Sequence, residues 1–356
     1  EKGASVIIYD DQDLPEQAYR ALRQKPKDVL AFGVPMLAKV APEIVARFFG
    51  LPAHQMTITA ITGTNGKTSC TCMLAQCLDH LQQHAAIMGS LGAGRMGSLS
   101  KDRSLTTPDM VTFQRNLATF RDQGMQHVVF EASSHGIDQK RFGYGNVTPI
   151  DVAVFTNLTQ DHLDYHGDMA NYANVKAQLF LREQLRSAVI NLDDPWGPSF
   201  AAQTRAKQVI GYGCEDSNAK VSQKIRAQNI ESSIGQLSFD LVSSWGKGRV
   251  ETALTGRFQV YNVMAIIGSL LALGVSWRKA LDVVQDLKDV NGRMNVFGGG
   301  SQPFVIVDYA HSEHALSMVL QSIRDWCQGK LWCIMGCGGN RDQGKRKNMG
   351  LVAEQY

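Results

Sequence analysis

The sequence has no long apolar run and no dense block of basic residues. Its longest apolar stretch, residues 263–275, contains Gly268 and Ser269 and is shorter than the roughly 20 residues that a membrane-spanning helix needs. A net charge of +3 over 356 residues gives little basic surface for nucleic acid or an anionic membrane. No secretory signal opens the chain. We therefore expect a buried helix at 263–275, and neither nucleic acid nor a membrane as a partner.

Cysteines are few and lack the spacing of a zinc site or a disulfide framework. There are seven, an odd number, and Cys70, Cys72 and Cys77 fall within one expected helix. Reduced thiols are typical of the cytoplasm, which is the expected location.

The composition, 44% hydrophobic and 19% charged, is that of an ordinary globular protein. The length exceeds what one hydrophobic core usually serves, so we expect two or three domains. Glu1 stands where an initiator Met would be and Tyr356 ends within a pattern, so the chain is expected to be part of something longer.

The order of apolar segments predicts an α/β fold in three parts. Residues 1–34 hold a short strand at 6–9 and an apolar run at 28–32, the remnant of a small leading domain. From 35 to 290, strands alternate with helical patterns, which predicts a mostly parallel sheet with helices on both faces. The expected elements of this part are strands at 56–61, 128–130, 152–155, 188–190 and 209–210, an antiparallel ribbon within 219–254 and a helix at 262–273.

Residues 291–356 begin a further domain. Strands are expected at 304–307 and at 331–335, the second ending in a glycine turn. A hinge is expected at 290–293, between this part and the preceding one.

The strongest single feature is a glycine-punctuated turn between a strand and a helix. It reads Gly63, Thr64, Asn65, Gly66, Lys67, Thr68, with Ser69 opening the helix and Ile61 where the usual first glycine would stand. Backbone N–H groups freed by glycine can wrap a phosphate, and the lysine can neutralise its oxygens. The threonine hydroxyl suits Mg²⁺. The pattern predicts a phosphate-binding loop; the alternative is a plain turn before a helix.

Two more strands end in polar residues. The strand at 128–130 leads into Glu131, and the strand at 152–155 leads into Asn157 and a loop that holds Asp161, His162 and His166. Because parallel strands present their carboxyl ends at one edge of a sheet, these groups are expected beside the phosphate loop, where Glu131 can bind the magnesium of a nucleotide. The alternative for Glu131 is a helix cap.

These segments, in this order, resemble the Mur ligase family over essentially the whole chain. The resemblance extends to Tyr172 and Lys176, which match the segment of the family's carbamylated lysine. From the sequence alone, Lys176 would be a surface lysine. The resemblance instead implies a carbamate that helps hold a second Mg²⁺ together with His162. It thus implies catalytic roles for Lys67, His162 and Lys176, and a metal set of Thr68, Glu131, His162 and modified Lys176.

The resemblance assigns further residues to three ligands. For ATP they are the phosphate loop with Ser69, and also Asn262, Arg293 and Asp308. For the UDP-N-acetylmuramoyl dipeptide they are Thr106, Thr107, Ser133, Gln139 and Arg141. For the incoming amino acid it is Arg341, for which a surface turn is the alternative. The implied architecture adds a Rossmann-like C-terminal domain, truncated at the end of the chain.

The resemblance implies a monomeric, ATP- and Mg²⁺-dependent ligase of peptidoglycan precursor synthesis. It would add the third amino acid, diaminopimelate or lysine with diaminopimelate preferred, to the dipeptide through an acyl phosphate. Three alternatives remain open. One is a ligase like folylpolyglutamate synthetase, and another is a nucleotide-binding regulatory protein without ligase activity. The third is an inactive fragment, because the resemblance places most UDP-binding residues before Glu1.

Overall fold

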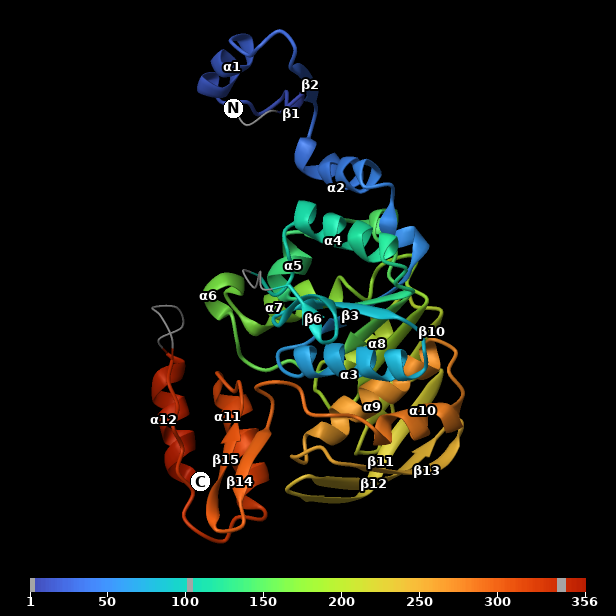
Figure 1. The fold of residues 1–356 in the computed structure, drawn as a ribbon, viewed down its shortest axis with the longest axis vertical. Coiled ribbons are helices and arrows are strands. Elements are labelled where there is room, and N and C mark those ends of the chain that lie inside the picture. The colour runs from blue at the N-terminus through green and yellow to red at the C-terminus, as the bar shows by residue number, and fades with distance from the viewer. Residues whose placement is uncertain (1–3, 101–104, 338–343) are drawn as a thin grey trace.

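The computed structural model describes residues 4–100, 105–337 and 344–356. Within these ranges, eleven strands form one continuous sheet and two further strand pairs stand apart from it (Figure 1). In spatial order the large sheet contains β13 (Gly246–Thr252), β12 (Gln236–Ser243), β11 (Gln223–Ser233), β10 (Gln208–Gly213), β9 (Ser187–Asn191), β8 (Val152–Phe155), β3 (Thr57–Thr62), β7 (His127–Glu131), β4 (Ala85–Gly89), β5 (Gly92–Arg95) and β6 (Ser98–Leu99).

The pairing is parallel from β11 through to β4 and antiparallel at both ends of the sheet. The predicted α/β class, the mostly parallel sheet and the antiparallel ribbon are therefore confirmed. The strands β4 to β6 were not predicted. β5 and β6 are short and glycine-rich or polar, so they lack the apolar pattern of a buried strand. β4 is apolar and fully buried, and its sequence did carry that pattern.

Helices cover both faces of this sheet. On one face lie α3 (Lys67–His80), α9 (Gln259–Ala272) and α10 (Trp277–Gln285). The other face is covered by α4 (Met110–Asp122), α5 (Ser134–Asp138), α7 (Met169–Ala177) and α8 (Gly197–Gln203), with the short elements α6 (Leu163–His166), η1 (Pro52–Gln55) and η2 (Gly145–Val147) nearby.

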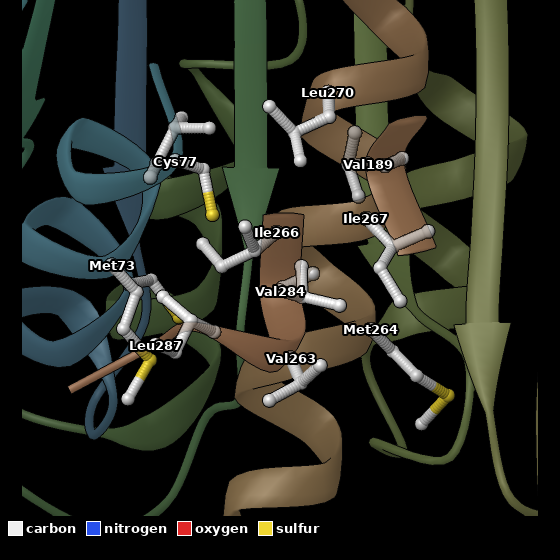
Figure 2. Packing of buried hydrophobic residues seen from close by; sticks show 14 of the residues in the cluster. Met73, Cys77, Val189, Val263, Met264, Ile266, Ile267, Leu270, Val284 and Leu287 are labelled. Carbon is white, nitrogen blue, oxygen red and sulfur yellow. The ribbon is translucent and has the colours of Figure 1, made fainter. Parts of the chain in front are cut away.

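The apolar stretch at 263–275 forms a buried helix up to Ala272, as predicted. Nearly every residue of α9 is buried, because the helix packs between the sheet and its two neighbours. Figure 2 shows Met73 of α3, Ile266 of α9 and Val284 of α10 meeting in this core. Across the described ranges, no helix has the length and apolar character needed to cross a membrane.

The leading segment forms a small unit at one end of the molecule (Figure 1). Its strands β1 (Val6–Asp10) and β2 (Leu30–Val34) pair in parallel around α1 (Glu16–Arg23), and α2 (Leu37–Phe48) leads to the sheet. The helix α2 is followed by Gly50, whose left-handed φ of 73° suits a glycine just past a helix end.

The last segment contains the hairpin of β14 (Asn295–Gly299) and β15 (Gln302–Val307), followed by α11 (Glu313–Arg324) and α12 (Lys345–Gln355). The strand predicted at 331–335 is wrong. These residues form no strand, since none of the described strands pairs with them, and Trp332 and Ile334 are exposed. Apolar alternation is not enough for a strand that lacks a hydrogen-bonding partner.

Candidate active site

Three adjacent strands bring the predicted segments together. Strand β3 lies between β7 and β8, and all three run parallel. Their carboxyl ends therefore meet at one edge, with the phosphate loop after β3, Glu131 at the end of β7, and Thr156 and Asn157 after β8. Proteins with a parallel α/β sheet bind their ligands at this edge, at the point where the order of the strands reverses. The predicted convergence of these segments is confirmed.

The phosphate loop is held by hydrogen bonds from the residues after β8. Asn157 accepts bonds from the amides of Thr64, at 2.8 Å, and Asn65, at 2.9 Å, while the Thr156 hydroxyl donates to the Asn65 carbonyl at 2.6 Å. Gly66 caps α3 with φ 86°, and a Cβ there would lie 2.7 Å from the Asn262 side chain. Only glycine fits this corner, and α3 consequently points its N-terminus at the space above the loop.

Two lysines from different elements share one acceptor in this loop. The amines of Lys67 and Lys176 each donate to the Gly63 carbonyl at 2.9 Å, and Lys67 also donates to the Thr64 carbonyl at 2.8 Å. Lys176 is 1% exposed, so the surface reading of this residue is wrong. Burial, and then the neighbouring Lys67 charge, lower the pKa of Lys176 well below its usual value. Burial also lowers the pKa of Lys67.

Glu131 faces the start of α3. Its two carboxylate oxygens each accept from the Thr68 hydroxyl at 3.0 Å, and one accepts from the Ser90 amide at 2.8 Å. Gly89 leaves room for this carboxylate, since a Cβ there would lie 2.1 Å from it. The cap of α5 is Ser133, whose hydroxyl accepts from the Gly136 amide, so the helix-cap reading of Glu131 is wrong.

His162 opens α6 in a left-handed conformation with φ 55°. Its Nε2 lies 3.4 Å from Asp161, and its ring lies 5.1 Å from that of His135. Burial is the main cause that lowers the pKa of His162 to about 4, with His135 and the two lysines acting in the same direction and Asp161 opposing them. The neutral imidazole is the form that binds metals. Asp161 was expected beside the phosphate loop without a role of its own, and His135 had not been predicted.

These residues fit a nucleotide-bound Mg²⁺ better than a preformed metal cluster. No three His, Cys, Asp or Glu side chains within the described ranges are grouped to hold a metal. The Glu131 carboxylate and the Thr68 hydroxyl nevertheless meet beside the phosphate loop. Mg²⁺ usually takes one or two carboxylates and completes its shell with water and substrate phosphates, so this sparse oxygen pair suits it.

A cavity of about 530 Å³ opens from the phosphate loop toward the last segment. Asn262 lines it with Phe258 and Tyr261 from one side, while Arg293 and Asp308 line it from the other. Asp308 is held by the amides of Met294, at 2.9 Å, and Ala310, at 2.8 Å. Arg293 also donates to the Thr68 hydroxyl at 3.0 Å, which joins the last segment to the phosphate loop.

Several lining residues had not been predicted. They are Asp193, Asp194, Tyr212, Tyr261, His314 and Met318, and Ser69 is found among the lining as expected. The signal for the aspartates was the end of β9, a strand that the sequence did predict. Nothing in the sequence pattern distinguished Tyr212 or Met318 from core residues.

The residues assigned to the dipeptide form a connected network beside Glu131. Thr106 bonds Ser90 at 3.1 Å, and the Thr107 hydroxyl donates to the Glu131 carbonyl at 2.7 Å and lies 2.9 Å from the Ser133 hydroxyl. Arg141 donates to the Thr107 carbonyl at 2.8 Å and to the Gln139 side chain at 3.0 and 2.7 Å. Arg341 lies outside the described residues.

The fold and the site together define a nucleotide-using enzyme with a phosphate-binding loop at the edge of a parallel sheet. Comparison with known proteins agrees. Residues 61–270 match the Mur ligase middle domain, and residues 292–356 match the Mur ligase, glutamate ligase domain.

Two relatives carry the same name, UDP-N-acetylmuramoyl-L-alanyl-D-glutamate–2,6-diaminopimelate ligase. The protein from Chromobacterium violaceum is 41% identical over 360 residues, which cover 100% of this chain and 70% of the relative. The protein from Pseudomonas aeruginosa is 39% identical over 356 residues, covering 99% of this chain and 70% of the relative. A solved structure of a ligase with this name is 30% identical with a TM-score of 0.76, and covers 98% of this chain and 73% of that one.

The chain belongs to the Mur ligase family. Mur ligases are enzymes that use ATP to form a C–N bond.

Proposed function

We propose that this protein joins 2,6-diaminopimelate to UDP-N-acetylmuramoyl-L-alanyl-D-glutamate in peptidoglycan precursor synthesis. Relatives that bear the corresponding name are about 40% identical over essentially the whole chain, which supports this acceptor and this amino acid. The observation that carries the chemistry is the shared carbonyl of Gly63, where Lys67 and the buried Lys176 meet beside Glu131.

The reaction begins by making a better leaving group. An oxygen of the D-glutamyl carboxylate attacks the γ-phosphorus of ATP, a new P–O bond forms, and the bond to ADP breaks. Negative charge spreads over the phosphoryl oxygens as this occurs. Lys67 and the N-terminus of α3 lie where they offset that charge, and Arg293 approaches the same point through Thr68.

Thr68 and Glu131 would hold the Mg²⁺ that accompanies ATP, and His162 would hold a second ion together with Lys176. Bound there, Mg²⁺ neutralises phosphate charge and aligns the reacting oxygens. Lys176 takes part as a carbamate. Because its buried amine has a lowered pKa, the neutral form can attack CO₂; an N–C bond forms and the nitrogen releases a proton, which leaves an anion in place of an ammonium.

The second step forms the amide. The neutral amine of the amino acid attacks the acyl carbon, a tetrahedral intermediate forms, and phosphate leaves with the C–O electron pair while the nitrogen loses a proton. No covalent intermediate with the enzyme is needed. Arg341 is proposed to bind the carboxylate of the amino acid. Rotation about 290–293, where Gly292 has φ 71°, is proposed to close the last segment over ATP.

We further propose that the protein acts as a monomer in the cytoplasm, where nucleotide-linked precursors and ATP are available. The reaction uses small molecules on both sides and needs no macromolecular partner. The three domains are proposed to span 1–34, 35–290 and 291–356.

Phosphate release tests this function against its alternatives. The protein is incubated with ATP and one of two substrate pairs: the UDP-muramoyl dipeptide with diaminopimelate, or a folate with L-glutamate. Phosphate release that depends on the dipeptide supports the proposal. The rates of release with diaminopimelate, lysine and ornithine are then compared to identify the amino acid. Release that depends on folate would favour a ligase like folylpolyglutamate synthetase. Nucleotide binding that no acceptor turns into phosphate release would favour a regulatory protein.

A further inference from the structure

Tyr165 has contacts that the proposed mechanism leaves unused. It lies on α6, three residues after His162, and its side chain is 42% exposed beside the dipeptide network. Its hydroxyl donates to Asp138 at 2.7 Å and accepts from the Gln139 side-chain amide at 3.3 Å. The bond to Asp138 is the main cause that raises the pKa of Tyr165.

Gln139 connects Tyr165 to Arg141. Gln139 accepts from Arg141 with the oxygen of the same amide group that donates to Tyr165. The Tyr165 hydroxyl therefore fixes which way this amide faces, and a fixed amide gives Arg141 an oxygen at 2.7 Å. Arg141 in turn reaches the carbonyl of Thr107.

The ring of Tyr165 contacts two imidazoles near His162, the residue proposed to hold a metal ion. It lies 4.1 Å from the ring of His135 and 4.8 Å from that of His166, and His135 lies 5.1 Å from His162. One side chain thus contacts both the segment that holds Gln139 and the cluster that contains His162.

We propose that Tyr165 is a positioning residue for the acceptor, which orients Gln139 and Arg141 relative to the phosphorylation site. This inference rests on the proposed function and adds a residue to the same site. The hydroxyl sets the acceptor-binding side chains, whereas the ring keeps α6 against α5. Removing the hydroxyl alone weakens binding of the UDP-muramoyl dipeptide and leaves the nucleotide side unchanged.

The test compares Tyr165→Phe with Tyr144→Phe. Tyr144 is a matched control, because its side chain is 41% exposed and it lies on the loop after Arg141, outside the network. Phosphate release is measured on the full chain and on both variants, at a series of concentrations of the UDP-muramoyl dipeptide. For Tyr165→Phe we expect the KM of the dipeptide to rise about fivefold to tenfold, as for one lost hydrogen bond, with kcat within about twofold. The melting temperature and the Kd for ADP should match those of Tyr144→Phe.

A double-mutant cycle separates positioning from a general structural role. In a Gln139→Ala background, the further change Tyr165→Phe should have almost no effect on the KM of the dipeptide, because its partner is already absent. Additive effects would overturn the proposal, as would a Tyr165→Phe variant with the KM of Tyr144→Phe. If the unsubstituted protein releases no phosphate in response to the dipeptide, the proposed function itself fails and this inference falls with it. If it does and only the Tyr165 effect is missing, the proposed function stands.

Discussion

The cavity beside the phosphate loop has one wall made of the ends of β3, β8 and β9 and a second wall made of the loop and helix that follow β15. In the first wall, the strands are buried on both faces and hold the polar side chains in register. In the second, β15 is largely exposed and Asp308 is fixed by two backbone amides. The first wall is therefore a rigid frame for charged groups, while the second depends on a few hydrogen bonds and can move toward it.

The largest effect on activity is expected from a substitution in the phosphate loop, which belongs to the first wall. Lys67→Ala removes the cation that faces the phosphoryl oxygens, and we expect kcat for ligation to fall about 10³-fold. The measurement is dipeptide-dependent phosphate release, with circular dichroism to show that the fold is retained. A fall of less than about tenfold would mean that the phosphate loop does not stabilise the transition state.

Lys176→Ala tests a residue of α7 that contacts the first wall through the Gly63 carbonyl. We expect ligation to be abolished, with a loss of at least about 10²-fold, because the carbamate proposed to position a second metal ion cannot form. The affinity for ADP, measured by calorimetry, should stay within about twofold. Lys207→Ala is the control, since Lys207 is exposed and directly precedes β10, at the end of the sheet opposite to the phosphate loop. Full activity of Lys176→Ala would contradict the carbamate assignment.

Arg293→Ala tests the connection between the walls. It removes the bond to Thr68, and the KM for ATP should rise about tenfold, as expected for a hydrogen bond from a charged donor. The KM of the dipeptide should change much less. Equal effects on both substrates would indicate that Arg293 acts on the whole fold.

A smaller effect is expected at Asp308. Asp308→Asn retains one acceptor for the two amides and loses the charge, so the KM for ATP should rise about threefold. If Asp308→Asn instead lowered kcat for ligation as much as Lys67→Ala does, the second wall would be as important to catalysis as the first.

The smallest effect concerns stability in acid. Burial lowers the pKa of His127 at the start of β7, so the folded protein holds this proton less tightly than the unfolded chain does. Stability from this group is full above pH about 6.5 and is lost as the pH falls through the lower folded value. His127→Gln should therefore lose less stability than the unsubstituted protein between pH 7.5 and 5.5, values chosen on either side of about 6.5, in urea unfolding. If both proteins lost the same free energy of unfolding over this pH range, His127 would not contribute to the pH dependence of stability.

The sequence could predict residues at the ends of strands better than contacts between elements that are distant in the chain. The phosphate loop, Glu131 and the segment around His162 follow apolar strands whose order implies one edge, so their convergence was predictable. The burial of Lys176 was not, because a lysine on a short helix gives no sign of what packs over it; only the family resemblance indicated it. The strand predicted at 331–335 failed because pairing depends on a neighbour and not on local pattern. The role proposed for Tyr165 rests on contacts between α6 and the loop after α5, which no local spacing specifies.

The central claim is that the acceptor carboxylate is phosphorylated by ATP at this site. The direct test uses a UDP-muramoyl dipeptide whose D-glutamyl side-chain carboxylate is labelled with ¹⁸O, with ATP and diaminopimelate. An acyl phosphate transfers one carboxylate oxygen to phosphate, so mass spectrometry of the released phosphate should find one ¹⁸O per molecule. Ligation that yields phosphate without ¹⁸O would contradict the account.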